Sequence, residues 1–260
     1  MNIIYSFKKM VQRFLIKSIF KIHPLVYFFT ILSFLIGYYK EFIIVSFLII
    51  VHELGHFLCA KSFGVKTKQI YIYPLGGVSQ FYMNINTSFC KEFLILIMGP
   101  MFQNIAYFIL CFFFPNSLVY HYHVGILFFN LLPIYPLDGG KILNLFVNYF
   151  FPFKKSLQIS ILISYVVTVL ILFLHQEFSI NMILNYLLFL MIIRKEERRI
   201  PLYYHKFLLE RLFHSFSFRR SIIISKEESF YRYRRNIVQK DNSFLDEVDY
   251  LKNKYFSKNY

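Results

Sequence analysis

The sequence is poor in acidic residues. It holds 14 Asp and Glu against 29 Lys and Arg, which gives a formal net charge of +15. A basic chain suggests nucleic acid as a partner, but no recognised nucleic-acid-binding motif accompanies the charge. Cations that flank membrane spans on the cytoplasmic side explain it better, and more than half of them lie from Arg194 onward. We therefore expect no nucleic-acid partner, and expect lipid to lie beside these residues.

Cysteine is also scarce. Cys59, Cys90 and Cys111 are an odd number and lack the spacing of a metal site. All three lie in or beside apolar segments, where a free cysteine acts as a small buried hydrophobe. The cysteines therefore indicate neither a disulfide framework nor a zinc site.

What the chain has in abundance is apolar residues, at 57%, gathered in long blocks rather than periodic stripes. A helix needs about 20 residues to cross the hydrocarbon core of a bilayer. The blocks predict an all-α polytopic membrane protein with six transmembrane helices and a short cytoplasmic tail domain. The predicted spans are Leu25–Tyr39, Phe42–Ala60, Phe93–Phe114, Val124–Tyr149, Leu157–Leu174 and Ile180–Ile193.

Loop charges predict the orientation. With the N-terminus inside, the inner loops carry most of the Lys and Arg, whereas the outer stretches Pro115–His123 and His175–Ser179 carry none. Both termini are therefore expected in the cytoplasm. We divide the chain into an amphipathic segment at 1–22 on the membrane surface, a six-helix domain at 23–199 and a C-terminal region at 200–260.

The stretch Lys61–Cys90 between the second and third spans differs from its surroundings. Residues 68–73 alternate polar and apolar side chains as a strand does, Pro74, Gly76 and Gly77 interrupt the pattern, and Val78–Met83 resume it. We expect a β-hairpin or short sheet near the inner surface. At membrane depth, such backbone must be shielded by protein or line a wet cavity.

The second span contains the motif His52-Glu53-Leu-Gly-His56. Positions i and i+4 share a helix face, so the two imidazoles can bind one zinc ion while Glu53 reaches a water as general base. A carboxylate at bilayer depth costs roughly 2.5–3.5 kcal/mol on insertion scales, which favours a functional role. The alternatives are hydrogen-bonding contacts between helices or a transporter pathway, although no internal repeat supports transport.

A third zinc ligand is needed, since catalytic zinc has three protein ligands and a water. Asp138 is the only acidic residue between Glu92 and Glu177, and it lies in the middle of the fourth span. Pro133, Pro136 and the glycines at 139 and 140 break the helix there, which would let the carboxylate turn toward the metal. Glu53 precedes Lys61 by eight residues, so the site should lie about 12 Å from the inner end of its span.

At this point the chain resembles the site-2 protease family of intramembrane zinc proteases. The resemblance covers His52–His56, Pro74-Leu-Gly76-Gly77, Gly99-Pro100 with Asn104, and Asn130–Gly140, in the family's order. The segments Lys21–Pro24, Phe129–Lys141 and His205–Arg211 make it most similar to the sporulation branch, which processes the pro-form of sigma-K.

The resemblance implies residue roles and partners. His52, His56 and Asp138 would hold one Zn²⁺, Glu53 would activate water, and Asn130 would help to bind substrate or the oxyanion. Pro74, Gly76, Gly77 and Pro136 would shape the substrate site.

The substrate would be a pro-sigma factor or another membrane-associated protein, and the location would be the outer forespore membrane, on the mother-cell side. Inhibitory membrane proteins and further copies of the chain are possible partners. The branch also has a C-terminal CBS-type domain that senses ATP, but residues 201–260 are too few for a CBS pair.

Overall fold

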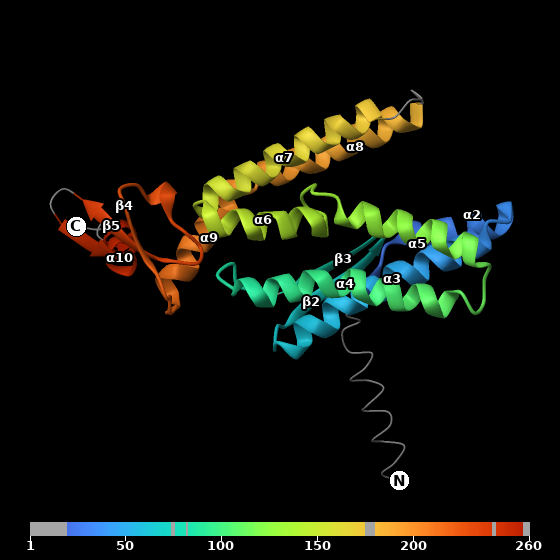
Figure 1. Cartoon of the computed structure of the whole chain (residues 1–260), viewed down its shortest axis with the longest axis horizontal. Coiled ribbons are helices and arrows are strands. Elements are labelled where there is room, and N and C mark those ends of the chain that lie inside the picture. The colour runs from blue at the N-terminus through green and yellow to red at the C-terminus, as the bar shows by residue number, and fades with distance from the viewer. Residues whose placement is uncertain (1–19, 74–75, 82, 175–179, 241–242, 257–260) are drawn as a thin grey trace, which may run out of the picture. The chain divides into compact units, whose positions relative to one another are not determined.

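The computed structural model describes residues 20–73, 76–81, 83–174, 180–240 and 243–256 (Figure 1). They divide into two compact units. Among the described residues, the first comprises those up to 83 and those in 94–127, and the second comprises those in 84–93 and from 128 onward. The helices α4 (Phe89–Leu110) and α5 (Asn116–Leu131) each contribute to both units.

The first unit begins with two apolar helices, α2 (Pro24–Ile36) and α3 (Tyr39–Ser62). Pro24 stands at the start of α2, where its missing N–H costs nothing, and the His23 side chain caps the helix by accepting from the Leu25 N–H at 3.3 Å. Gly37 ends α2 with φ of +93°, a left-handed conformation that favours glycine. The tight connection predicted between the first two spans is therefore confirmed.

The predicted hairpin is also confirmed. Strands β2 (Thr67–Tyr73) and β3 (Gly76–Phe81) pair in antiparallel fashion, with Tyr73 opposite Gly76. The sheet has a third strand that we did not predict: β1 (Phe20–Ile22) lies parallel to β2, with Phe20 opposite Ile70. The expected amphipathic helix falls mostly outside the described residues, and at its end the chain is strand instead. Backbone pairing to β2 decides that conformation.

The fourth predicted span is broken as expected, and the helix that leads into it starts earlier than the predicted span. Helix α5 begins at Asn116, so most of the predicted outer loop 115–123 is helical. Its polar side chains lower the local hydropathy, yet Val119 and His123 are buried in the protein. Helix α6 (Asp138–Phe150) follows after residues 132–137.

The second unit continues with α7 (Phe153–Leu174), α8 (Ile180–Glu197) and α9 (Ile200–Phe213). The C-terminal region adds β4 (Ser221–Ile224), a short 3-10 helix at Glu227–Ser229, β5 (Arg235–Lys240), β6 (Ser243–Asp246) and α10 (Glu247–Phe256). Strand β5 pairs parallel to β4 and antiparallel to β6. This second sheet was not predicted.

Three described helices are long and apolar enough to cross a membrane, namely Tyr39–Ser62, Phe89–Leu110 and Phe153–Phe173. Helix α2 is apolar but shorter. The chain is thus a mostly helical membrane protein with small sheets, and the count of six crossings remains a prediction.

Candidate metal centre and active site

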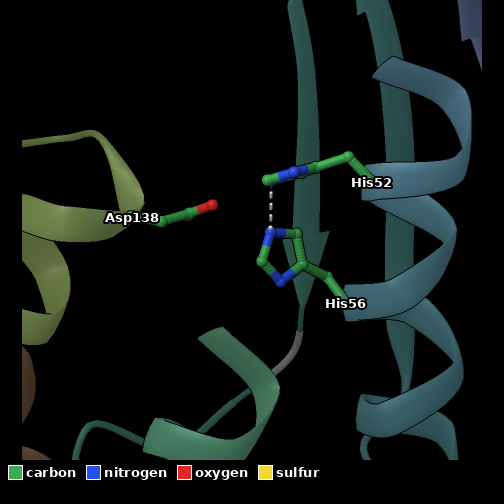
Figure 2. Close-up of side chains that lie close together, drawn as sticks. All are labelled: His52, His56 and Asp138. Carbon is green, nitrogen blue, oxygen red and sulfur yellow. Dashed lines mark hydrogen bonds between the residues drawn. The ribbon is translucent and has the colours of Figure 1, made fainter. Parts of the chain in front are cut away.

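The zinc-binding motif lies in the second half of α3, on its buried side. His52 and His56 project from successive turns (Figure 2) and are 3% and 5% exposed, while Glu53 is 7% exposed. The helix continues to Ser62, so the motif lies within a regular helix. The predicted i, i+4 relationship of the two imidazoles is therefore present.

The Nδ1 atom of each imidazole is anchored to α4, by a side chain for His52 and by the main chain for His56. The Nδ1 of His52 lies 3.0 Å from Oε1 of Gln103, and the Nδ1 of His56 lies 2.7 Å from the carbonyl oxygen of Ile95. Such partners on the far nitrogen are what fixes a metal-ligating histidine in its tautomer and orientation. The arrangement makes Nε2 the candidate ligand atom of each ring.

The two Nε2 atoms face each other at 3.1 Å, the contact dashed in Figure 2. Two nitrogens bound tetrahedrally to zinc at 2.0–2.1 Å would be about 3.3 Å apart. The spacing and the neutral imidazole donors therefore fit a zinc ion.

Helix α4 approaches the motif closely because it carries a glycine there. A β-carbon added at Gly99 would lie 2.8 Å from Nε2 of His52 and would overlap the His56 ring. Gly55, within the motif itself, has the same effect from α3, since its added β-carbon would lie 2.8 Å from Cβ of Phe102 on α4. The two glycines allow α3 and α4 to pack almost backbone to backbone.

Strand β3 covers Glu53. A β-carbon added at Gly77 would lie 2.8 Å from Oε1 of the Glu53 carboxylate and 2.7 Å from its Cδ. Gly77 pairs with Ile72 in the hairpin, so its position is set by the ladder. The glycine-containing element of the hairpin is thereby brought to the motif, as the sequence suggested, although Pro74 lies outside the described residues.

Asp138 is the first residue of α6 and is 8% exposed. Its Oδ1 lies 3.3 Å from Nζ of Lys141, one turn along the helix. Acidic residues are favoured in the first turn by the helix dipole. Because Asp138 begins its helix, its carboxylate stands at the end of the broken segment rather than along a continuous span (Figure 2).

The segment before Asp138 folds back on itself. A β-carbon at Gly140 would lie 2.5 Å from the backbone N of Tyr135, and one at Gly139 would lie 2.5 Å from the Leu132 carbonyl oxygen. The Tyr135 N–H donates to Oγ of Ser164 on α7 at 2.8 Å. The break foreseen from the prolines and glycines is therefore an ordered turn.

Of the remaining predicted site residues, Asn130 is half-buried near the end of α5, and Pro136 is half-buried in the segment before α6. The structure adds Gln103, which the sequence reasoning missed. The available signal was an amide within an otherwise apolar stretch of α4, beside the Gly99-Pro100 and Asn104 positions that we had noted.

The part of the chain that carries this geometry matches a known protein family. Residues 40–124, which include the His52–His56 motif and all of α4, match the model of peptidase family M50. This part of the chain is therefore similar to peptidase family M50. The resemblance to site-2 proteases drawn from the motifs is thereby confirmed.

Proteins similar to this chain agree with that resemblance. Stage IV sporulation protein FB of Bacillus subtilis is 32% identical over 149 residues, which cover 54% of this chain and 51% of that protein. A zinc metalloprotease of Methanocaldococcus jannaschii is 33% identical over 130 residues, 46% of this chain and 38% of that protein. The chain thus spans about half the length, or less, of these relatives.

A solved structure of a site-2 protease from Methanocaldococcus jannaschii is also similar. It has a TM-score of 0.52 at 27% identity, and the match covers 68% of this chain and 89% of that one. The likeness therefore extends well beyond the segment that the M50 model matches.

Proposed function

We propose that the chain is an intramembrane zinc metalloendopeptidase. The observation that carries the proposal is the pair of buried imidazoles on α3, whose Nε2 atoms lie 3.1 Å apart while both Nδ1 atoms are anchored. The M50 match over the same residues supports it. Zinc, when bound, supplies Lewis-acid chemistry and lowers the pKa of water toward 7.

Asp138 is proposed as the third protein ligand. Its support is that Asp138 is buried and begins α6, directly after the break in the fourth predicted span. Two imidazoles and one carboxylate form a donor set found in catalytic zinc sites, which keep a further position open for water.

Glu53 is proposed as the general base. It follows the first histidine directly, so its carboxylate lies beside the imidazoles rather than among the ligands. In this role it takes a proton from the attacking water and later gives it to the leaving amine. Asn130 is proposed to donate a hydrogen bond to the substrate carbonyl or the oxyanion, and Pro136 to shape the segment around Asp138.

The substrate is proposed to bind as an added strand. A helical substrate hides its carbonyls in backbone hydrogen bonds, so it has to be held extended before cleavage. Strand β3 is at one edge of the described three-stranded sheet. It begins with Gly76 and Gly77, and Gly77 lies against Glu53. Backbone pairing to that edge would hold an extended peptide close to the general base.

The substrate class is proposed to be a membrane-associated protein, in particular a sporulation pro-sigma factor of the pro-sigma-K type. The similarity to stage IV sporulation protein FB supports this choice. The same similarity supports a location in the outer forespore membrane, on the mother-cell side.

Co-expression of the full chain with a candidate pro-sigma factor tests the proposal. Wild type should shorten the substrate, Glu53→Gln should leave it full length while keeping zinc, and Glu41→Gln, at the other end of α3, should behave as wild type. Metal analysis of the purified protein should find one zinc per chain. Substrate shortening by Glu53→Gln, or wild-type protein without zinc, would overturn the proposal.

A further inference from the structure

Gln103 is a buried amide whose two ends have different partners. Its side chain is on α4 and has no exposed surface. The Nε2 donates to the main-chain carbonyl of His123 on α5 at 3.0 Å, and the Oε1 lies 3.0 Å from Nδ1 of His52. The amide therefore joins α5 to the first histidine of the motif.

These contacts determine which way round the amide lies. A carbonyl oxygen can only accept hydrogen bonds, so the end of Gln103 that faces the His123 carbonyl must be the NH₂ group. The oxygen of Gln103 then faces His52. Because an amide oxygen also only accepts, Nδ1 of His52 must carry its proton.

A neutral imidazole with its proton on Nδ1 has a lone pair on Nε2. His56 has the same tautomer, because its Nδ1 lies 2.7 Å from the Ile95 carbonyl oxygen, which can only accept a hydrogen bond. Both motif histidines are thereby held in the tautomer that presents Nε2 as a ligand. For His56 the main chain enforces this, whereas for His52 it depends on one side chain.

We propose that Gln103 is a positioning residue that fixes His52 in its metal-binding tautomer, with the His123 carbonyl fixing Gln103 in turn. The inference rests on the zinc site proposed above. The competing explanation is that Gln103 only links two membrane helices by hydrogen bonds.

Two substitutions separate the explanations. Gln103→Glu keeps an acceptor for the His52 Nδ1–H and loses the donor to the His123 carbonyl, while Gln103→Leu loses both. A positioning role predicts that the Leu variant binds zinc about 10- to 100-fold more weakly, the usual effect of losing such a partner, and that the Glu variant keeps affinity near wild type. A helix-linking role predicts that both variants are impaired alike.

The measurements are zinc affinity, by competition with a chelator on the full-length purified chain, and ¹⁵N NMR of labelled histidine in the metal-free protein. The NMR spectrum should place the His52 proton on Nδ1 in wild type and in Gln103→Glu, and should show mixed tautomers in Gln103→Leu. Gln158→Leu, the same substitution at an exposed position of α7, should match wild type.

Three outcomes would overturn the inference. They are unchanged zinc affinity in Gln103→Leu, equal losses in the Leu and Glu variants, and a His52 proton on Nε2 in metal-free wild type. If the Leu variant does not fold, the Glu variant and the wild-type spectrum still decide. A wild-type chain that binds no zinc would instead refute the proposed function, so the two failures are distinguishable.

Discussion

Gly99 of α4 leaves no room for a side chain beside His52, since an added β-carbon would lie 2.8 Å from the Nε2 atom of that histidine. That nitrogen is also 3.1 Å from the Nε2 of His56. The glycine is therefore required by the two proposed ligand atoms. It lies on the helix that also supplies Gln103 and the Ile95 carbonyl, so α4 shapes the metal site as much as the motif helix does.

Replacement of Gly99 by alanine should push the imidazoles apart or force α4 away. We expect zinc affinity to fall by about 10-fold or more, as it does when ligand orientation is lost, and substrate cleavage to fall with it. Chelator competition measures the affinity. Gly125→Ala is the matched control, because an added β-carbon there meets nothing within 4 Å. Unchanged zinc affinity in Gly99→Ala would show that the packing is looser than the geometry requires.

Gly77→Ala should separate zinc binding from catalysis. The added methyl group would lie 2.8 Å from Oε1 of Glu53, so the carboxylate has to move while the histidines stay in place. A positioned general base contributes about 10²–10⁴-fold to rate, and we expect cleavage to fall toward that limit with zinc stoichiometry unchanged. Loss of zinc together with activity would indicate instead that β3 supports the whole site.

Local patterns in the sequence predicted the elements that carry the chemistry. The i, i+4 histidines, the alternating strand at 68–73 and the break before Asp138 each depend on neighbouring residues, and all three are present. What local patterns could not give was pairing over long distances. Strand β1 forms because residues 20–22 meet β2 some 50 positions later.

Gln103 illustrates the same limit within the site. An isolated amide in an apolar helix can serve as a contact between helices or as support for a metal ligand. Its partners, the His123 carbonyl and the His52 ring, are what point to the second role, and both lie far from Gln103 in the sequence. The C-terminal sheet was missed for a related reason: its strands are short, with four residues in β4 and in β6, and are joined by polar segments.

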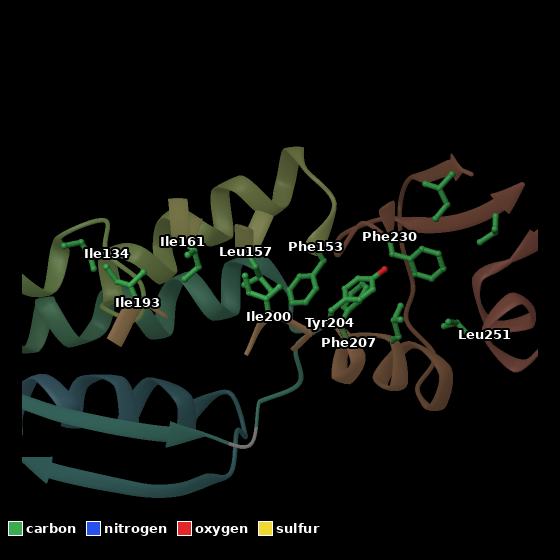
Figure 3. Close-up of a cluster of buried hydrophobic side chains, with 13 residues drawn as sticks. Ile134, Phe153, Leu157, Ile161, Ile193, Ile200, Tyr204, Phe207, Phe230 and Leu251 are labelled. Carbon is green, nitrogen blue, oxygen red and sulfur yellow. The ribbon is translucent and has the colours of Figure 1, made fainter. Parts of the chain in front are cut away.

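The C-terminal region contains a buried arginine, Arg211, with several polar and aromatic partners. Arg211 of α9 is buried, with Nη1 3.1 Å from Oε1 of Glu247, Nε 2.6 Å from Oδ1 of Asn86, and its guanidinium 4.1 Å from the centre of the Phe218 ring. Burial lowers its pKa to about 10 against the opposing effect of Glu247, so it remains charged at neutral pH. The nearby apolar core includes Phe207, Phe230 and Leu251 (Figure 3).

Arg211→Met should destabilise this region by about 3–5 kcal/mol, because it leaves the buried Glu247 carboxylate without its cation. Limited proteolysis of residues 200–260 and thermal unfolding measure the effect. Arg235→Met is the control. Arg235 pairs with Asp246 at 2.9 Å, but its side chain is 57% exposed, and exposed pairs contribute only about 0–1 kcal/mol. Equal effects of the two substitutions would contradict the importance assigned to burial.

The hydroxyl group of Ser164 helps to hold the turn before Asp138. Oγ of Ser164 accepts from the Tyr135 N–H at 2.8 Å and donates to the Ser160 carbonyl at 2.7 Å, and it is buried. Ser164→Ala would leave the Tyr135 amide without this acceptor, and an unsatisfied buried donor costs about 1–3 kcal/mol. Because Asp138 follows directly, we expect the loosened turn to weaken zinc binding.

Thr168→Val provides the comparison for Ser164→Ala. Thr168 is one turn along α7, is also buried, and donates only to the Ser164 carbonyl at 2.7 Å. Its loss removes a hydroxyl from the same helix face without touching the turn. Zinc titration of both purified variants should therefore show weaker binding for Ser164→Ala alone. Of the two substitutions, Ser164→Ala removes the hydrogen bond to the Tyr135 N–H and Thr168→Val does not. Weaker zinc binding in both variants would therefore mean that the packing of α7, rather than this hydrogen bond, keeps Asp138 in position.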